Sequence, residues 1–235
     1  MKLGVFSFNT EYTIRADELA IAAEERGFES IWFPEHTHIP ASRETAYPGG
    51  GPLPKEYIHM SDPFTSAAAA AVVTKTIKIG TGVCLVIEHD PLALAKTVAT
   101  IDRLSNGRFI LGVGAGWNAE EMENHGTPYS KRWKVLEERV KAMKALWTQE
   151  EASFKGDWVN FEKVWSYPKP VQKPHPPVII GTFGSKWGCQ RVADYAEGWI
   201  PIDGLMTSLD DSIADLHARL RENGRKPEDA PISMF

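Results

Sequence analysis

The sequence places glycines where a backbone could approach a phosphate or a flat ring. Gly112, Gly114 and Gly116 lie within or directly after the apolar run 109–113, and glycines that follow a strand often permit such an approach. A dinucleotide-binding fingerprint would need another glycine at Trp117 and normally follows the first strand of a fold. The loop therefore does not predict a Rossmann dinucleotide site. Two interpretations stay open, which are close packing at a strand end and approach of a ring or phosphate.

A second glycine-rich segment has the sequence GTFGSKW and spans 181–187. Gly181, Thr182, Gly184 and Ser185 precede an expected helix, and a hydroxyl-bearing loop at a helix N-terminus suits an anion. The alternative is that Ser185 only caps the helix. A phosphate held between a late strand and a helix start is common in barrels, which favours the phosphate interpretation.

Histidines are the next candidates for chemistry. His36 and His38 follow an expected strand, and strand alternation would place both on one side. An H-x-H pair at a strand end is a zinc-ligand arrangement, but a zinc site needs further ligands. The other nearby histidines, His59, His89 and His125, lie in expected loops without ligand spacing. We therefore expect no metal site, and one simple interpretation of His36 is that it caps a loop.

These candidates follow short apolar runs that alternate with amphipathic helical patterns. Continuous apolar strands separated by such helices predict a parallel sheet covered on both faces. A doubly wound sheet and a (β/α)8 barrel both fit, but the number of strands favours the barrel, which takes eight. The seven expected strands are 3–6, 30–33, 77–83, 109–113, 178–181, 198–202 and 232–235. We predict an α/β fold, a TIM-type barrel that lacks its last strand within the given chain.

Helix signals support this organisation. Gly27 and Gly224 are expected to end helices. Apolar residues spaced 3, 4, 3 and 4 apart predict a long amphipathic helix: Trp133, Leu136, Val140, Met143 and Trp147. We expect a single domain over 1–235, in which a long polar loop at 34–62 and a hairpin at 152–161 are insertions.

The composition narrows the class of protein. The chain has 235 residues, 43% of them hydrophobic, and a net charge of −5. A mildly acidic protein without a long apolar segment is not expected to bind nucleic acid or a membrane. The two cysteines, Cys84 and Cys189, do not make a disulfide framework and fit a reducing compartment. The N-terminus has no secretory signal pattern, so we expect a cytoplasmic protein.

Three long segments carry a resemblance to a known family. They are SIWFPEHTHIP, then IKIGTGVCLVIEHDPLALAKTVATIDRLSNGRFILGVGAGWNAEEMENHG, and finally FKGDWVNF with PKPVQKPHPPVIIG. The chain resembles the bacterial luciferase-like superfamily, and within it the branch of deazaflavin (F420)-dependent oxidoreductases. The resemblance covers nearly the whole chain. It implies a TIM-type barrel with an isoalloxazine or deazaflavin ring at the carboxyl ends of the strands.

The resemblance also implies roles for individual residues. His36 sits where a histidine or acid approaches the reactive face of the ring, to hydrogen-bond the cofactor or transfer a proton. Gly82 and Val83 match a non-proline cis peptide that forms a bulge behind the ring. Six further positions are implied to hold the cofactor: Gly114, Ala115 and Asn118 at the ring edge and ribityl chain, and Gly181, Thr182 and Gly184 at the phosphate.

One departure from the family bears on the substrate. Some relatives carry a carboxylate just after the glycine pair, where it acts as an acid in sugar-phosphate oxidation. The matching residue here is Ala115, which argues against a sugar-phosphate dehydrogenase. Glu120, Glu121 and Glu123 lie nearby and are expected in a solvated loop that runs on from Asn118.

Four functions follow as hypotheses. The first is an F420-dependent oxidoreductase that moves a hydride between the deazaflavin and an organic small-molecule substrate, and the second is an FMN-dependent monooxygenase on the same scaffold. The third is a non-catalytic flavin-binding protein, and the fourth is a metal-dependent hydrolase. Relatives in the family are often dimers, and unpaired barrel edges would favour pairing, so we expect a homodimer.

Overall fold

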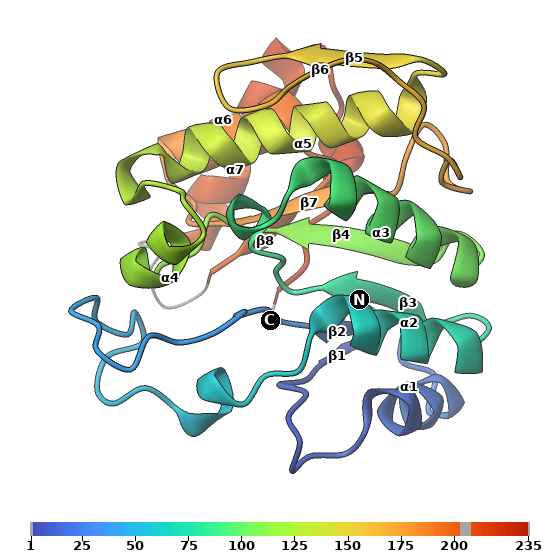
Figure 1. Cartoon of the computed structure of the whole chain (residues 1–235), viewed down its shortest axis with the longest axis vertical. Helices are drawn as coiled ribbons and strands as arrows, with labels where there is room; N and C mark the ends of the chain where they lie inside the picture. Colours follow the sequence, from blue (N-terminus) through green and yellow to red (C-terminus); the bar gives the residue numbers. More distant parts are fainter. Residues whose placement is uncertain (1, 203–207, 235) are drawn as a thin grey trace.

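The chain folds around a parallel sheet of six strands, seen in a computed structural model that describes residues 2–202 and 208–234. The strands lie in the order β1-β2-β3-β4-β7-β8, and each neighbouring pair is parallel. Their bounds are β1 Gly4–Phe6, β2 Ser30–Phe33, β3 Lys78–Thr81, β4 Phe109–Val113, β7 Val178–Thr182 and β8 Trp199–Pro201. The sheet curls into a half-barrel (Figure 1). This confirms the predicted TIM-type architecture with a strand missing.

Helices follow the strands, and the longer ones cover the convex side of the sheet. Their bounds are α1 Ala16–Glu25, α2 Pro63–Val73, α3 Pro91–Leu104, α4 Ala119–Asn124, α5 Arg132–Thr148, α6 Lys186–Tyr195 and α7 Leu209–Glu222. The spacing that predicted a long amphipathic helix is confirmed by α5. Among the described residues, none of the helices has the length and apolar character that a bilayer crossing requires.

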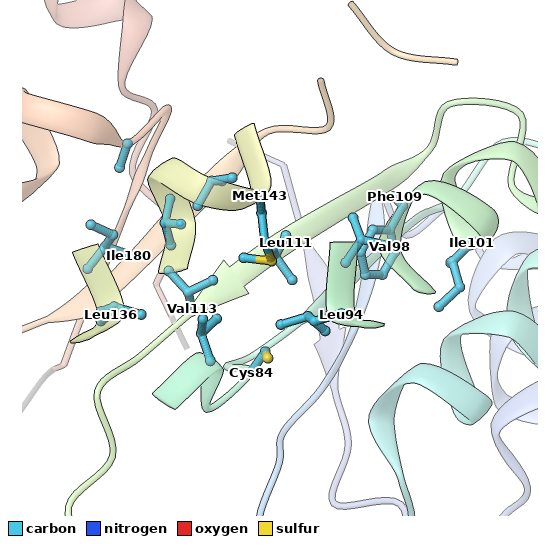
Figure 2. Packing of buried hydrophobic residues seen from close by; sticks show 14 of the residues in the cluster. Cys84, Leu94, Val98, Ile101, Phe109, Leu111, Val113, Leu136, Met143 and Ile180 are labelled. Atoms are coloured by element: carbon cyan, nitrogen blue, oxygen red, sulfur yellow. The ribbon is translucent and has the colours of Figure 1, made fainter. Parts of the chain in front are cut away.

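Alternate side chains of the strands point to opposite faces, as strand geometry requires. Phe33 of β2 and Leu111 of β4 join the main core, which lies between the sheet and the helices. Figure 2 shows Leu111 and Val113 beside Met143 of α5 in this core. On the concave face, Trp32, Ile179 and Ile200 form a smaller inner cluster, against which Phe6, Val83 and Ile110 pack. The concave face is therefore the side on which a ligand of the barrel would lie.

The long insertions leave the sheet at different places. Loop 34–62 contains only the short 3-10 helix η1, Lys55–Ile58, and runs on the same side as α4, toward which the β4 arrow points (Figure 1). The predicted hairpin is formed by β5, Ala152–Lys155, and β6, Asn160–Val164, and β5 packs on α5. The hairpin is thus associated with an outer helix, whereas the loop lies at the carboxyl ends of the strands.

Two predicted elements are wrong. The expected strand at 232–235 is a single bridge between Ile232 and Trp199, and Phe235 lies outside the described residues. Pro231, which precedes the bridge, has no N–H to donate to a ladder. The segment that begins at Asn118 was expected to be a loop but forms α4. The predicted third strand, 77–83, also stops earlier, at Thr81.

Candidate functional site

Strand β3 ends in a bulge at the rim of the half-barrel. The peptide bond between Gly82 and Val83 is cis, as the resemblance implied. The N–H of Gly82 donates to the carbonyl of Phe33 (2.8 Å), and the N–H of Cys84 donates to the carbonyl of Gly112 (2.7 Å). Both sides of the bulge are therefore tied to neighbouring strands. Gly82 and Val83 themselves remain partly exposed.

Val83 fills the space in front of two glycines on other strand ends. A Cβ added at Gly114 would lie 2.6 Å from Val83 Cγ2, and one added at Gly181 would lie 3.0 Å from Val83 Cγ1. Such short contacts require glycine or a shift of Val83. Close packing, one of the two interpretations of the glycine loop, therefore applies at Gly114. The accessible surface at this point of the rim belongs to Gly82 and Val83.

Ala115 and Asn118 lie just beyond β4 and are buried, with exposures of 3% and 1%. Asn118 Oδ1 accepts the N–H of Glu121 (3.4 Å) and so caps α4. Asn118 Nδ2 has no hydrogen-bond partner among the described residues. A buried amide N–H without an acceptor is costly, so this group suits a ligand oxygen.

His36 is held from both of its ring nitrogens. Its Nδ1 lies 2.6 Å from Glu121 Oε2, and its Nε2 accepts the indole N–H of Trp117 at 3.2 Å. Glu121 Oε1 also accepts the N–H of Thr37 (3.0 Å). The side chains of His36 and Glu121 are only 7% and 1% exposed. The helix α4 therefore brings a buried carboxylate to the candidate catalytic histidine.

Aromatic rings surround this histidine. The ring centroids of Tyr57 and Trp117 lie 5.3 and 5.5 Å from that of His36. Tyr47 packs against Tyr57 (5.2 Å) and Trp117 (6.0 Å), and Phe8 packs against Tyr57 (5.3 Å). Tyr47 and Tyr57 come from loop 34–62, so this loop brings aromatic side chains over the rim. All of these rings remain partly exposed.

Two more carboxylates, Glu35 and Glu88, are buried in the same part of the molecule as Glu121. Burial is the largest cause that raises the pKa of Glu88 to about 9, and the charges of Glu121 and Glu35 add to it. Glu88 is therefore a neutral acid at pH 7. Its Oε2 accepts the hydroxyl of Thr37 (3.3 Å), and its Oε1 has no partner among the described residues.

The Thr37 hydroxyl also contacts two histidines nearer the surface. It lies 2.7 Å from His125 Nε2 and 2.9 Å from His38 Nδ1. Burial lowers the pKa of His125. His38 Nε2 lies 2.9 Å from Asn124 Nδ2 of α4. Strand alternation predicted that His36 and His38 would share a side, but they contact different partners because the strand ends at Phe33.

Gly181 and Thr182, two of the predicted phosphate residues, end β7, and Gly184 lies between β7 and α6. Thr182 is 3% exposed, and its Oγ1 makes only a 3.5 Å contact with the carbonyl of Phe183. Ser185 Oγ accepts the N–H of Gly188 (3.1 Å), so the capping role considered for Ser185 is present. The carbonyl of Gly184 accepts the Ser212 hydroxyl (3.0 Å). The segment proposed for a phosphate thus leads from the end of β7 to the N-terminus of α6.

One group of described residues has metal-ligand atoms close together, namely Glu35, Cys84 and His89, within 4.8 Å of one another. Both oxygens of Glu35 already have partners. Oε2 accepts the N–H of Leu85 (2.6 Å), and Oε1 lies 2.8 Å from His89 Nε2. Burial, the largest cause, raises the pKa of the Cys84 thiol well above its usual value. The group is internally satisfied, and Cys84 belongs to the core (Figure 2).

Two grooves lie away from these residues. One of about 650 Å³ lies between α2 and α3 and is lined by Phe64, Ala68 and Leu104 among others. The other, of about 340 Å³, lies between the segment after β1 and α2. Neither contains the Gly82–Val83 bulge, so the candidate site is defined by the convergence of residues on the open concave rim.

The family model described as luciferase-like monooxygenase matches residues 1–235. The chain belongs to the luciferase-like monooxygenase family. This result confirms the resemblance given by the sequence segments.

Similar proteins include both cofactor types. An uncharacterized protein of Mycobacterium tuberculosis is 45% identical over 85% of this chain and 72% of its own length. The F420-dependent glucose-6-phosphate dehydrogenase of Amycolatopsis mediterranei is 34% identical over 71% of this chain and 47% of its length. The FMNH2-dependent dimethylsulfone monooxygenase of Pseudomonas putida is 33% identical over 57% of this chain and 38% of its length.

Solved structures share the fold. The monooxygenase RslO1 from Streptomyces bottropensis has a TM-score of 0.84 at 24% identity, over 100% of this chain and 70% of that chain. An F420-dependent secondary alcohol dehydrogenase, in complex with an F420-acetone adduct, has a TM-score of 0.78 at 26% identity, over 99% of this chain and 68% of that chain. The luciferase-like family thus comprises oxidoreductases and monooxygenases with a flavin-type cofactor, F420 or FMN.

Sequence reasoning missed residues of this luciferase-like site. Glu121 was expected in a solvated loop, yet it is buried and pairs with His36. Asn118 followed by glutamate three residues later is a typical helix start, and this signal could have found α4. Nothing local marked Tyr47, Tyr57 or Glu88, because their roles depend on contacts across the fold.

Proposed function

We propose that this luciferase-like chain is an F420-dependent oxidoreductase that transfers a hydride between the deazaflavin and an organic substrate. The observation that carries the proposal is the partly exposed Gly82–Val83 bulge, which is hydrogen-bonded to Phe33 at the end of β2, shortly before His36. An F420-dependent relative is 34% identical over 71% of this chain, and an F420-dependent secondary alcohol dehydrogenase shares its fold at 26% identity. These similarities support F420 as the cofactor.

The residues at the rim fit a flat ring with an anionic tail. Val83 offers a partly exposed apolar surface on which a ring can rest, and the unpaired Nδ2 of Asn118 can donate to an oxygen of the ribityl chain. Gly181, Thr182 and Gly184 would bind the phosphate at the N-terminus of α6, where backbone N–H groups favour an anion. When bound, the deazaflavin supplies the hydride-transfer chemistry.

The chain itself would orient the substrate and handle the proton. His36 would accept or donate the proton that accompanies hydride transfer, because it lies on the concave rim and is held by Glu121. Tyr47, Tyr57 and Trp117 would exclude water from the reacting atoms. Ala115 is buried and has no carboxylate, so a substrate other than a sugar phosphate is favoured.

A side-by-side titration with F420 and FMN tests the cofactor. Binding is measured by absorption and fluorescence. We expect saturable binding of F420 and no competition by FMN. Asn118→Ala should weaken binding about tenfold through loss of one hydrogen bond to the cofactor, whereas Asn124→Ala, on the exposed side of α4, should not. Binding of FMN alone would contradict the proposal.

The FMN-dependent monooxygenase is the second candidate, because of the 33% identity to the dimethylsulfone monooxygenase. It predicts a yellow protein whose reduced form reacts with oxygen.

If F420 binds stoichiometrically but no turnover occurs with any alcohol, carbonyl or alkene substrate tested, the hypothesis of a non-catalytic flavin-binding protein replaces that of an enzyme.

A further inference from the structure

Each oxygen of the Glu121 carboxylate has its own hydrogen-bond partner. Its Oε1 accepts the backbone N–H of Thr37 (3.0 Å), and its Oε2 lies 2.6 Å from Nδ1 of His36. An ionised carboxylate only accepts hydrogen bonds. The side chain of Glu121 is 1% exposed, so water does not replace either contact. His36 Nδ1 must therefore carry a proton and donate it to Glu121.

The other nitrogen of His36 faces a group that only donates. Trp117 Nε1–H lies 3.2 Å from His36 Nε2, and an indole N–H has no acceptor capacity. His36 Nε2 must therefore carry a lone pair. The two contacts together assign the neutral tautomer: the Glu121 contact requires a proton on Nδ1, and the Trp117 contact excludes a proton from Nε2.

We propose that Glu121 is a positioning residue that holds His36 in the Nδ1–H tautomer, so that Nε2 is the proton acceptor at the rim and Trp117 covers it. The effect of Glu121 on turnover rests on the proposed function, which gives His36 its part in proton transfer. The tautomer itself does not depend on it. It follows that the group which replaces the indole at Nε2 must itself be a hydrogen-bond donor, such as a hydroxyl.

The proposal predicts an unusual effect of an isosteric substitution. Glu121→Gln leaves one acceptor oxygen and one amide N–H₂ in place of two acceptors. The backbone N–H of Thr37 cannot change its role and will take the oxygen, so the amide N–H₂ will face His36 Nδ1. His36 Nδ1 must then accept, the proton moves to Nε2, and the contact with the Trp117 N–H is lost because two donors meet.

A matched control exists in the pair His59–Glu11. Its Nδ1 to Oε1 distance is also 2.6 Å, but its side chains are 36% and 63% exposed. A glutamine at position 11 can turn its oxygen toward His59, because no second buried donor holds it. Trp117→Phe is the complementary variant, since it removes the donor at His36 Nε2 but leaves Glu121 in place.

The test is two-bond ¹⁵N–¹H spectroscopy of the ¹⁵N-histidine-labelled chain, in which the protonated ring nitrogen is identified directly. We expect His36 to carry its proton on Nδ1 in the wild type and in Trp117→Phe, and on Nε2 in Glu121→Gln. Glu11→Gln should leave the His59 tautomer unchanged. A wild-type His36 protonated on Nε2, or a Glu121→Gln variant that keeps the proton on Nδ1, would overturn the proposal.

Kinetics separate this proposal from the proposed function. With the cofactor and substrate that give turnover, Glu121→Gln should lower kcat at least about tenfold and leave KM within about twofold. Unchanged kcat despite a switched tautomer would overturn the role of Glu121 as a positioning residue for turnover. Absence of turnover in the wild type with either cofactor would refute the proposed function, while the expected tautomer switch would still support Glu121 as the residue that sets the tautomer.

Discussion

Two histidine–glutamate pairs in this molecule have the same contact distance and different surroundings. In each pair a histidine Nδ1 lies 2.6 Å from a glutamate oxygen. The His36–Glu121 pair is almost fully buried at the rim of the half-barrel, whereas the His59–Glu11 pair is largely exposed. A distance alone would rank them as equals.

Burial and shared partners make the pairs different. The exposed pair competes with water, and such pairs contribute little to stability. The buried carboxylate of Glu121 also accepts the N–H of Thr37, and His36 is covered by Trp117. Removing one member there leaves other donors without acceptors in a place that water does not reach. The pair at the rim is therefore a fixed arrangement, as a site for proton transfer requires.

The largest expected difference between the pairs is in turnover. His36→Asn removes the candidate proton acceptor and should lower kcat about 10²- to 10⁴-fold, the usual contribution of a positioned acid or base. His59→Asn should leave kcat within about twofold. Steady-state kinetics of both variants, with cofactor binding measured alongside, checks this expectation. Equal effects of the two substitutions would remove His36 from the mechanism.

The next difference is in stability. Glu121→Ala leaves the Thr37 N–H and His36 Nδ1–H unpaired, and should lower the free energy of unfolding by about 2–4 kcal/mol. Glu11→Ala should hardly move the urea midpoint. Urea unfolding at pH 7 measures both. If the two variants unfold at the same urea concentration, burial does not distinguish the pairs.

The difference between local and long-range signals explains what the sequence could predict. The apolar runs 30–33 and 109–113 predicted β2 and β4, and the spacing of apolar residues predicted α5, because each of these signals is local. The contact of His36 with Glu121 joins residues 85 positions apart, and no local pattern encodes it. The resemblance, and not the spacing of residues, led to the cis bond at Gly82–Val83. The site was therefore predicted in outline and its hydrogen bonds were not.

A further expected effect depends on pH and concerns the neutral acid Glu88. Its pKa rises to about 9 in the fold from a usual value of 4.5, mainly because of burial. Between these values the folded state holds one proton more than the unfolded state, so stability falls as pH rises. The Glu88→Gln variant cannot ionise at this position, so its stability does not fall in this way as pH rises. The free energy of unfolding of the variant minus that of the wild type should therefore increase between pH 5 and pH 9, on the order of 1 kcal/mol per pH unit.

Urea midpoints of the wild type and Glu88→Gln at pH 5, 7 and 9 give this comparison. Glu123→Gln, at an exposed position in α4, provides a control for loss of a carboxylate. Two parallel pH profiles for the wild type and Glu88→Gln would show that Glu88 is ionised in the fold.

The smallest effect compares two neighbouring glutamates of α4. Glu121 is buried beneath loop 34–62, whereas Glu120 contacts the backbone of this loop. Glu120 Oε1 accepts the N–H groups of Glu44 (2.5 Å) and Thr45 (3.0 Å). Hydrogen bonds from Thr45, the largest cause, lower the pKa of Glu120 to about 2. Glu120→Ala should therefore speed amide exchange at residues 44 and 45 several-fold without changing the urea midpoint, because only the loop is released. Glu123→Ala, on the exposed side of the same helix, should change neither. If exchange in loop 34–62 stays at the wild-type rate in Glu120→Ala, the aromatic side chains of the loop are held over His36 by their own packing, and α4 acts on the site through Glu121 alone.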